Sequence, residues 1–312
     1  MEILVESVVP REHSESRLDT YLAHRFTYKS RTAWRREINE GRILFNGTKI
    51  RNHHKKLKWG DRIKYEGMSY IEPEVDRSIS ILYEDEDIIA VNKTGNLPVH
   101  PAGIFFFNTL QTILDEKLGI RTRPMHRLDR ETSGVVIFAK NRETASAIQT
   151  RFTDVKKSYT AIVHGEPEAD EFENRLPIGP ARNSPVRKKR EAYPEAPETA
   201  HTVFTKKTAF SGYSLIEARP VTGRQHQIRV HLNSLGLPIA GDKLYGSDDN
   251  LYLRFLEEGN SPELISILEM KRCALHSSAI EFTHPGTTGR IRIEAPLASD
   301  MEAFILEKGG KL

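Results

Sequence analysis

The sequence of 312 residues lacks the features of an exported or membrane protein. Its single cysteine, Cys273, excludes an internal disulfide and a cysteine-based metal cluster. Cys273 has mostly apolar neighbours, so we expect a buried, unreactive thiol. No apolar run approaches the ~18 residues of a membrane span, and the N-terminal segment lacks the basic and apolar regions of a signal or transit peptide. We therefore expect a cytoplasmic protein with no membrane partner.

Motifs for nucleotide, dinucleotide and metal chemistry are also missing. The segment GLPIAGDK at 236–243 resembles a phosphate-binding loop, but an aspartate separates its second glycine from the lysine, and no Ser or Thr follows. The sequence contains no GxGxxG, HExxH or GxSxG. His226 and His231 would point to opposite faces of a strand, which makes them poor joint ligands. We expect no metal and no cofactor, nucleotides included.

Acidic residues are scarce in one short region. Residues 17–64 hold 14 of the 46 Lys and Arg residues but only 4 of the 43 Asp and Glu residues, which leaves 32 basic and 39 acidic residues elsewhere. The net charge of +3 thus conceals a strongly basic region on an acidic body. Such a concentration of positive charge favours a polyanion as the partner, although a lysine-rich solvated face is the ordinary alternative.

Two short helices are predicted in this basic region. Ser16 and Asp19 form a capping-box pattern for a helix that ends near Phe26. Ser30 is placed to cap a second helix, and Gly41 is placed to end it. Arginines cluster on this second helix away from its apolar positions, so we expect them to face outward.

A hairpin and a linker follow the helices. Asn46-Gly47 is a strong signal for a two-residue turn between strands. We place the end of the first domain at residue 68, a linker at 69–78 and a second domain at 79–312. In that domain strands alternate with few long helices, which are expected at 144–152 and 262–271, and 177–197 is expected to be a loop whose RKKR segment at 187–190 could contact phosphate.

Three segments of the second domain stand out: HRLDRETSGVVIFAK at 126–140, KKSYTAIVHG at 156–165, and RPVTGRQHQIRVHLNSLGLPIAGDKLYG at 219–246. In the first, a crowded polar run passes directly into an apolar strand. A solvated turn is the ordinary explanation for such charges. A carboxylate held ionised by arginines is the functional alternative, because a nearby cation lowers the pKa of a carboxyl group. Ser133 has no evident catalytic triad, so we expect it to shape the turn beside Gly134.

Together these segments resemble the RluA-type pseudouridine synthases, from about residue 79 to residue 304. The first domain is similar to S4-type RNA-binding domains, through RLDTYLA, GRILFNG and a later Gly-Asp. The resemblance implies an α+β fold in which a long mixed, mainly antiparallel sheet is flanked by helices and crossed by an RNA cleft. Thr94 and Ser277 depart from the residues usual in the family, at positions that we take to be peripheral to the chemistry.

The resemblance also assigns residues. Asp129 matches the catalytic aspartate, Tyr159 the active-site tyrosine, Arg229 the arginine that pairs with the aspartate, and Arg127 the arginine that fills the base stack when the nucleotide is flipped out. Arg127 and Asp129, two residues apart, would face one cleft from a strand, and we assign no role to Arg130 or Glu131. Further RNA contacts are expected from His126, Arg224 and His226 in the second domain and from Arg31, Arg35 and Lys55 in the first.

The expected activity is the isomerisation of specific uridines in structured RNA to pseudouridine. Ribosomal RNA is the favoured substrate, with transfer RNA as the second choice, and we expect a monomer. The carboxylate could attack C1′ of the ribose or remove the 2′ proton to give a glycal, and the sequence does not choose between them. The alternatives are a non-catalytic RNA-binding protein and a glycosylase that releases uracil.

Overall fold

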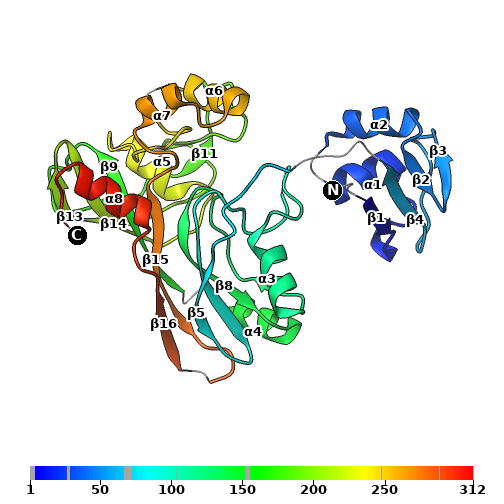
Figure 1. Ribbon diagram of the computed structural model, residues 1–312, viewed down its shortest axis with the longest axis horizontal. Coiled ribbons are helices and arrows are strands. Elements are labelled where there is room, and N and C mark those ends of the chain that lie inside the picture. Colours follow the sequence, from blue (N-terminus) through cyan, green and yellow to red (C-terminus); the bar gives the residue numbers. More distant parts are fainter. Residues whose placement is uncertain are drawn as a thin grey trace. The chain divides into compact units, whose positions relative to one another are not determined.

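The computed structural model describes residues 4–26, 29–66, 72–102, 104–151, 155–246, 248–287 and 289–311. The chain divides into two units (Figure 1). The first comprises Met1–Val75 and His100–Thr112, and the second comprises Asp76–Val99 and Ile113–Leu312. Part of the expected linker, residues 67–71, lies outside the described residues.

The first unit packs two helices against a four-stranded antiparallel sheet of order β1-β4-β2-β3. Trp34 and Ile38 of the second helix are fully buried in its core, together with Leu18 and Leu22 of the first. The elements are β1 (Leu4–Val8), the short 3-10 helix η1 (Arg11–His13), α1 (Leu18–Arg25), α2 (Arg31–Asn39), β2 (Ile43–Phe45), β3 (Thr48–Ile50) and β4 (Arg62–Glu66).

The local signals in this unit have mixed outcomes. The Ser30 hydroxyl accepts a hydrogen bond from the Ala33 amide at 3.1 Å and caps α2 as predicted. Asn46 and Gly47 both have positive φ, 48° and 84°, and join β2 to β3 in the predicted hairpin. The capping box at Ser16 was wrong, because α1 begins at Leu18 without a side-chain cap.

The second unit is built on a ten-stranded mixed sheet of order β10-β13-β14-β9-β15-β8-β6-β5, with β16 beside β15 and β7 beside β8. Among the described strands only β15 and β8 pair in parallel. The expected α+β fold with a mainly antiparallel sheet is thus confirmed. The strands are β5 (Ser80–Glu84), β6 (Ile88–Lys93), β7 (Arg123–Pro124), β8 (Ser133–Ala139), β9 (Lys156–His164), β10 (Glu171–Asn174), β13 (Thr202–Phe210), β14 (Tyr213–Pro220), β15 (Leu275–Thr283) and β16 (Arg290–Glu294).

Helices lie along both halves of this sheet in Figure 1, α3 and α4 near β8 and α8 near β13 and β14. They are α3 (Leu110–Leu118), α4 (Arg142–Arg151), α5 (Gln227–Ser234), α6 (Asn250–Glu258), α7 (Pro262–Leu268) and α8 (Ser299–Glu307). The predicted helices at 144–152 and 262–271 correspond to α4 and α7. The segment 177–197 was expected to be a loop but contains a hairpin of β11 (Ile178–Pro180) and β12 (Arg190–Ala192).

Strand β8 explains why the apolar run after the polar HRLDRETSG segment is so regular. All seven of its residues are buried in the middle of the sheet, as expected for a strand covered on both faces. Gly134 has φ +107°, and a Cβ there would lie 2.2 Å from the carbonyl oxygen of Ser277. Only glycine fits this close approach between β8 and β15. The Ser133 hydroxyl is buried and hydrogen-bonded to Nδ1 of His276 at 2.9 Å, so it does not shape a turn.

Candidate active site

The polar segment before β8 is a loop whose backbone is hydrogen-bonded to a buried lysine. Lys93, at the end of β6, is fully buried, and its ammonium group donates to the carbonyl oxygens of Leu97 at 2.8 Å and Arg130 at 3.0 Å. The Leu97 amide also donates to the Arg130 carbonyl at 3.0 Å. Arg127 and Asp129 lie in this loop and not on a strand as expected, because β8 begins only at Ser133. The hydrogen bonds of Lys93 and Leu97 fix the backbone of the loop beside Asp129.

Glu131, the residue that follows Arg130, holds the same loop through its side chain. Its carboxylate accepts a hydrogen bond from the buried ammonium of Lys243 at 3.0 Å and another from the Cys273 amide at 3.1 Å. Glu131 thus has a structural role that the sequence interpretation did not assign. The charges around Asp129 are part of a buried network and not merely a solvated turn.

Arg229 reaches Asp129 from helix α5, where the sequence interpretation had placed a strand. Its Nη1 donates to Oδ2 of Asp129 at 2.7 Å. Asp242 holds the rest of the guanidinium group and accepts hydrogen bonds from Nε at 2.6 Å and from Nη2 at 2.8 Å. Asp242 is itself fixed by the backbone amides of Leu244 and Tyr245 and by the buried thiol of Cys273.

This arrangement keeps Asp129 ionised. Burial would raise the pKa of the Asp129 carboxyl, but the charges of Arg229 and, to a smaller extent, other groups outweigh burial and lower the pKa below its usual value. Arg229 donates to Oδ2, whereas Oδ1 accepts no hydrogen bond from any residue within the described part of the chain. One carboxylate oxygen is therefore anchored, and the other is available for reaction.

Two further polar side chains face this carboxylate or its cavity. Nε2 of His226 lies 3.8 Å from Oδ2 of Asp129, and Nδ1 of His226 lies 2.7 Å from the hydroxyl of Tyr245. Tyr159 projects from β9 and is buried, which raises the pKa of its hydroxyl well above the usual value. Ser277 lies directly opposite Tyr159 in the sheet, so it is not peripheral as expected.

A cavity of about 430 Å³ brings most of the expected residues together. Its volume is within the range of about 300–1,000 Å³ that is typical of small-molecule sites. Among the residues that line it, Arg127 is exposed to solvent. The His126 ring is held by the backbone, because its Nε2 accepts a hydrogen bond from the Ile137 amide at 3.3 Å. Nε of Arg224 donates to the carbonyl oxygen of Thr199 at 2.9 Å. The predicted residues that line the cavity are His126, Arg127, Asp129, Tyr159, Arg224, His226 and Arg229.

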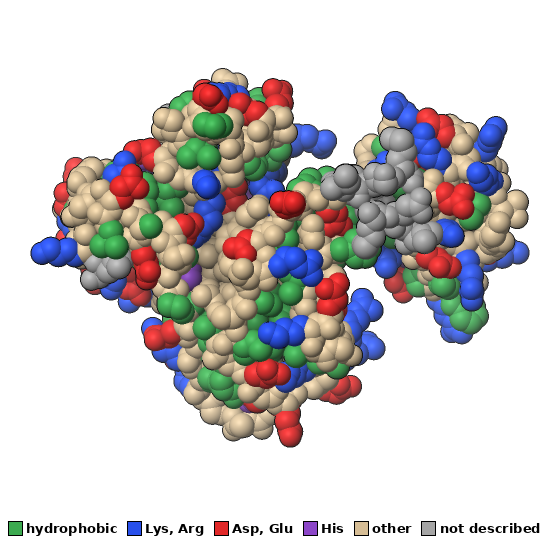
Figure 2. Space-filling view, in the orientation of Figure 1, with side chains coloured by type: hydrophobic (Ala, Val, Ile, Leu, Met, Phe, Trp, Pro, Cys, Tyr) green, Lys and Arg blue, Asp and Glu red, His purple; other side chains and the backbone are tan. Residues whose placement is uncertain are grey.

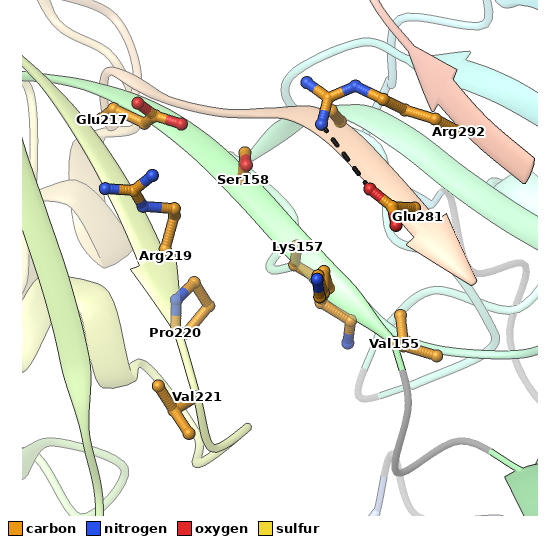
Figure 3. A pocket seen from close by; sticks show the side chains of 11 residues that line it. Val155, Lys157, Ser158, Glu217, Arg219, Pro220, Val221, Glu281 and Arg292 are labelled. Carbon is orange, nitrogen blue, oxygen red and sulfur yellow. Dashed lines mark ion pairs between the residues drawn. The ribbon is translucent and has the colours of Figure 1, made fainter. Parts of the chain in front are cut away.

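A second cavity, of about 480 Å³, shares Lys157 and Pro220 with the first. Figure 3 shows its side chains projecting from neighbouring strands, with Arg219 and Arg292 on opposite sides of Lys157. Arg292 forms an ion pair with Glu281 at 4.0 Å, which is drawn as a dashed line. Burial lowers the pKa of the Lys157 ammonium to about 8. The surface next to the Asp129 cavity is thus hollowed and carries both signs of charge.

The remaining predicted residues lie in the first unit. Arg31 and Arg35 donate to the buried carboxylate of Asp19 at 2.9 and 2.7 Å, and Arg17 joins them at 3.2 Å. The ammonium of Lys55 lies 5.2 Å above the ring of Phe45. Figure 2 shows Lys and Arg side chains spread over the visible face of this unit. The arginines are therefore not simply solvated but held around a shared acid.

Among the described residues, no group of three or more His, Cys, Asp or Glu side chains is placed to hold a metal ion. His226 and His231 do not share a ligand site, because Nδ1 of His231 contacts the Thr202 hydroxyl at 2.9 Å. No helix in the described ranges has the length and apolarity needed to cross a membrane.

Comparison with known proteins shows the family to which the chain belongs. The chain is 34% identical to an uncharacterized RNA pseudouridine synthase of Chlorobaculum parvum over 96% of both chains. The chain belongs to the RNA pseudouridine synthase family. A family profile described as RNA pseudouridylate synthase matches residues 87–234 of this synthase, a range that contains Asp129, Tyr159 and Arg229.

Other relatives have named substrates. The synthase is 31% identical to ribosomal large subunit pseudouridine synthase D of Xanthomonas campestris, over 97% of this chain and 92% of the relative. It is 34% identical to the mitochondrial tRNA pseudouridine(32) synthase of Saccharomyces cerevisiae, over 69% of this chain and 47% of the relative. The structure of human RNA pseudouridylate synthase domain containing 1 has the same fold, with a TM-score of 0.58 and 24% identity over 75% of this chain and 90% of that one.

Sequence reasoning missed three residues of the site. Asp242 and Tyr245 contact Arg229 and His226, the two side chains beside the Asp129 carboxylate. Lys93 contacts the backbone of Arg130, the residue after Asp129. Asp242 and Tyr245 belong to the third segment, at 219–246. The sequence interpretation rejected 236–243 as a phosphate-binding loop and used the segment for the family resemblance, but it gave neither residue a role. Asp242 could have been found from the sequence, because it is an acid in the same segment as Arg229, the arginine expected to pair with Asp129.

Proposed function

We propose that this pseudouridine synthase isomerises specific uridines in structured RNA, ribosomal RNA first and transfer RNA second, with Asp129 as the catalytic aspartate. One observation carries the proposal: an ionised carboxylate is anchored through Oδ2 by Arg229 and leaves Oδ1 open in a cavity that also contains Tyr159. A positioned, ionised carboxylate is the group that nucleophilic attack at a sugar carbon requires. The same carboxylate could instead act as a general base and remove a proton from the 2′ carbon of the ribose.

The two chemical routes use the same oxygen. In the first, Oδ1 of Asp129 bonds to C1′ while the bond from C1′ to N1 of uracil breaks. In the second, the carboxylate takes the 2′ proton while uracil leaves and a glycal forms. In both, uracil turns in the cavity and C5 bonds to C1′. The bond between Oδ1 and C1′ breaks in this step of the first route, and the 2′ proton returns from the protonated carboxyl group in the second. The C5 proton is then lost, and N1 of uracil takes up a proton. Tyr159 keeps its proton at neutral pH because burial raises its pKa, so it is suited to stack on uracil and to donate a hydrogen bond.

Access to the glycosidic carbon requires that the nucleotide leaves the RNA stack, at a free-energy cost of a few kcal/mol. Arg127 is exposed at the cavity that holds Asp129. A guanidinium plane can stack where a base has been removed. We assign Arg127 to this role, and His126, Arg224 and His226 to the cavity in which the flipped nucleotide is bound.

Within the first unit, residues 1–68 are proposed as an S4-like RNA-binding domain, joined by residues 69–78 to the catalytic domain at 79–312. Its support is the excess of basic residues at 17–64 and the three arginines around Asp19. Their side chains remain 32–45% exposed, so they can reach a phosphate while Asp19 orients them. The relative named for the large ribosomal subunit favours ribosomal RNA. We propose a monomer that acts in the cytoplasm.

The reaction is tested with RNA that carries tritium at C5 of uridine. A synthase releases the label into water and leaves the mass of the RNA unchanged, and Asp129→Asn should abolish the release. Free uracil in the reaction would instead identify a glycosylase, and release by the Asp129→Asn variant would exclude Asp129 as the reacting group. Pseudouridine mapping in ribosomal and transfer RNA from wild-type and deletion cells identifies the target.

A further inference from the structure

Tyr245 connects three parts of the active site. Its side chain is 1% exposed, and the guanidinium carbon of Arg229 lies 4.9 Å from the centre of its ring. Its hydroxyl oxygen lies 3.0 Å from the Arg190 amide nitrogen in β12 and 2.7 Å from Nδ1 of His226. The hydroxyl is thus buried between a backbone donor and an imidazole nitrogen.

The two contacts define where the hydroxyl proton lies. The Arg190 amide can only donate, so the Tyr245 oxygen accepts from it. Within the described ranges His226 is the only group near the hydroxyl that can accept its proton, so the proton is satisfied only by donation to Nδ1. If Nδ1 carried a proton instead, a buried hydroxyl would be left without an acceptor, which costs about 1–3 kcal/mol.

A neutral imidazole that accepts at Nδ1 carries its proton on Nε2. Nε2 is the nitrogen that lies 3.8 Å from Oδ2 of Asp129, so the N–H group is directed to the side of the catalytic carboxylate. The charged groups that act on His226 are Asp129, Arg229, Asp242 and Lys188. Burial, together with the positive charges of Arg229 and Lys188, outweighs the carboxylates of Asp129 and Asp242 and lowers the pKa of His226 to about 4, so the ring is neutral at physiological pH.

We propose that Tyr245 is a positioning residue of the reaction, whose hydroxyl selects the His226 tautomer that presents an N–H donor to Asp129 and the flipped nucleotide. The proposal rests on the role of Asp129 proposed above. The opposite tautomer would direct a lone pair of the imidazole at a carboxylate, which is repulsive. Selection of the donor tautomer thus stabilises the ionised state of Asp129 and supplies a fixed donor in the cavity.

The backbone of His226 supports a functional reason for this geometry. His226 has φ +58° and ψ 16°, a left-handed conformation that is uncommon for residues other than glycine. Such strain is held in place by its surroundings and is frequent at functional sites. Here it directs the ring between Tyr245 and Asp129, while the Tyr245 amide is fixed by Oδ1 of Asp242 at 3.1 Å.

The tautomer is observed directly by NMR of protein labelled with ¹⁵N-histidine. The His226 signals are assigned by their loss in His226→Gln, and the wild-type protein should show a protonated Nε2 and an unprotonated Nδ1. Tyr245→Phe keeps the ring that Arg229 contacts and removes only the hydroxyl. It should shift the His226 signals toward a mixture of tautomers. A protonated Nδ1 in the wild type, or unchanged His226 signals in Tyr245→Phe, would overturn the proposal.

A double-mutant cycle separates tautomer selection from general packing. Tyr245→Phe should lower kcat by about tenfold, as expected for the removal of a hydrogen bond of about 1.4 kcal/mol, and leave KM for RNA within about twofold. In His226→Gln the amide nitrogen has no tautomers, so adding Tyr245→Phe should lower the remaining activity by less than about twofold. Equal losses in both backgrounds would assign Tyr245 to packing alone and refute the proposal.

Two controls complete the design. Tyr213→Phe removes another buried tyrosine hydroxyl, which donates to Glu269 away from the cavity, and should leave kcat unchanged. Asp129→Asn tests the underlying role of Asp129 separately. Full activity in that variant would contradict the proposed function, whereas the NMR result on His226 would still decide which tautomer Tyr245 selects.

Discussion

Asp242 holds Arg229 by two hydrogen bonds, Nε to Oδ2 at 2.6 Å and Nη2 to Oδ1 at 2.8 Å, while the third nitrogen of the same guanidinium donates to Asp129. A guanidinium bound at two nitrogens by one carboxylate has a fixed plane and direction. Asp242 is fully buried and its pKa is held far below the usual range because the charge of Arg229 outweighs burial. The orientation of Arg229 toward Asp129 therefore depends on Asp242, which is not hydrogen-bonded to Asp129.

We expect Asp242→Asn to lower kcat by about 100-fold, the loss typical of a misplaced catalytic group. The amide would place an N–H group against an N–H of Arg229 and remove the charge that orients it. Binding of RNA should change by less than about twofold, because Asp242 does not line the cavity. Tritium release and RNA affinity measured on the same preparation separate the two effects.

The matched control is Asp85→Asn. Asp85 also accepts hydrogen bonds from two backbone amides, those of Asp87 and Ile88, but it lies outside the cavity. It should retain full kcat. If Asp242→Asn loses no more activity than this control, Arg229 is oriented by other contacts.

The pH dependence of the reaction should reveal the contribution of Arg229. In the wild type the Asp129 pKa lies below 3.8, so the carboxylate is ionised and no loss of kcat/KM due to Asp129 is expected between pH 5 and 8. Arg229→Gln removes the largest of the charges that oppose burial and should therefore raise the pKa of Asp129. Because activity requires the ionised form, it should then be lost as the pH falls through the raised pKa.

Rates of tritium release between pH 4 and 9 test this shift. The control is Arg224→Gln. It removes another guanidinium from the same cavity, but this one donates to the Thr199 carbonyl, so the loss of activity at low pH should occur at the same pH as in the wild type. An acidic limb at the same pH in Arg229→Gln and in the wild type would show that Arg229 does not set the ionisation of Asp129.

The sequence was sufficient to name Asp129, Tyr159 and Arg229, and the structure brings all three to one cavity. It was misleading about the helix that carries Arg229. Residues 227–232 alternate polar and apolar side chains as a half-buried strand would. In the structure these residues form a helix in which two of the polar side chains are buried as well. Gln227 and His231 are both hydrogen-bonded to the Thr202 hydroxyl. Burial of polar groups by distant partners cannot be read from local periodicity.

Long-range charge explains two other misses, the capping box and the role of Glu131. The capping box at Ser16 assumed that Asp19 would serve its own helix, but Arg31 and Arg35 of the next helix bind its carboxylate. Glu131 was given no role, because its partner Lys243 lies 112 residues away. Asp19 and Glu131 were both noticed in the sequence, but only the fold shows which positively charged side chains bind their carboxylates.

Glu131 and Lys243 should contribute strongly to stability. Lys243 has 3% and Glu131 18% of its side chain exposed, so removing one partner leaves a poorly solvated charge. We expect Lys243→Met to lower the free energy of unfolding by about 3 kcal/mol. Glu131→Gln combined with Lys243→Met should cost less than the sum of the single changes, because the pair acts as a unit.

Urea unfolding followed by circular dichroism measures these differences. Lys206→Met serves as the control, since Lys206 pairs with Glu166 and Asp170, whose side chains are 60% and 79% exposed. Its loss should cost less than about 1 kcal/mol. Equal effects of Lys206→Met and Lys243→Met would contradict a special role of the buried pair.

The last prediction concerns RNA binding by the first unit. Charge reversal of Arg31, Arg35 and Lys55 to glutamate should weaken binding, but it would also place acids beside buried Asp19 and destabilise the unit. Glutamine at the three positions removes the charge with less repulsion. Each phosphate that the variant no longer neutralises should lower the slope of log K against log salt by about 0.7–0.9, because fewer counterions are released, so three such phosphates should lower it by about 2.

Fluorescence anisotropy of a labelled ribosomal RNA fragment at several salt concentrations gives this slope. The matched control replaces Lys117, Arg175 and Lys311, three exposed cations of the second unit, by glutamine. Both variants lose three positive charges, so a general effect of net charge would weaken binding equally in the two. A larger decrease of the slope in the first variant assigns the phosphate contacts to the arginines around Asp19 and to Lys55, whereas equal slopes would make that face an ordinary solvated surface.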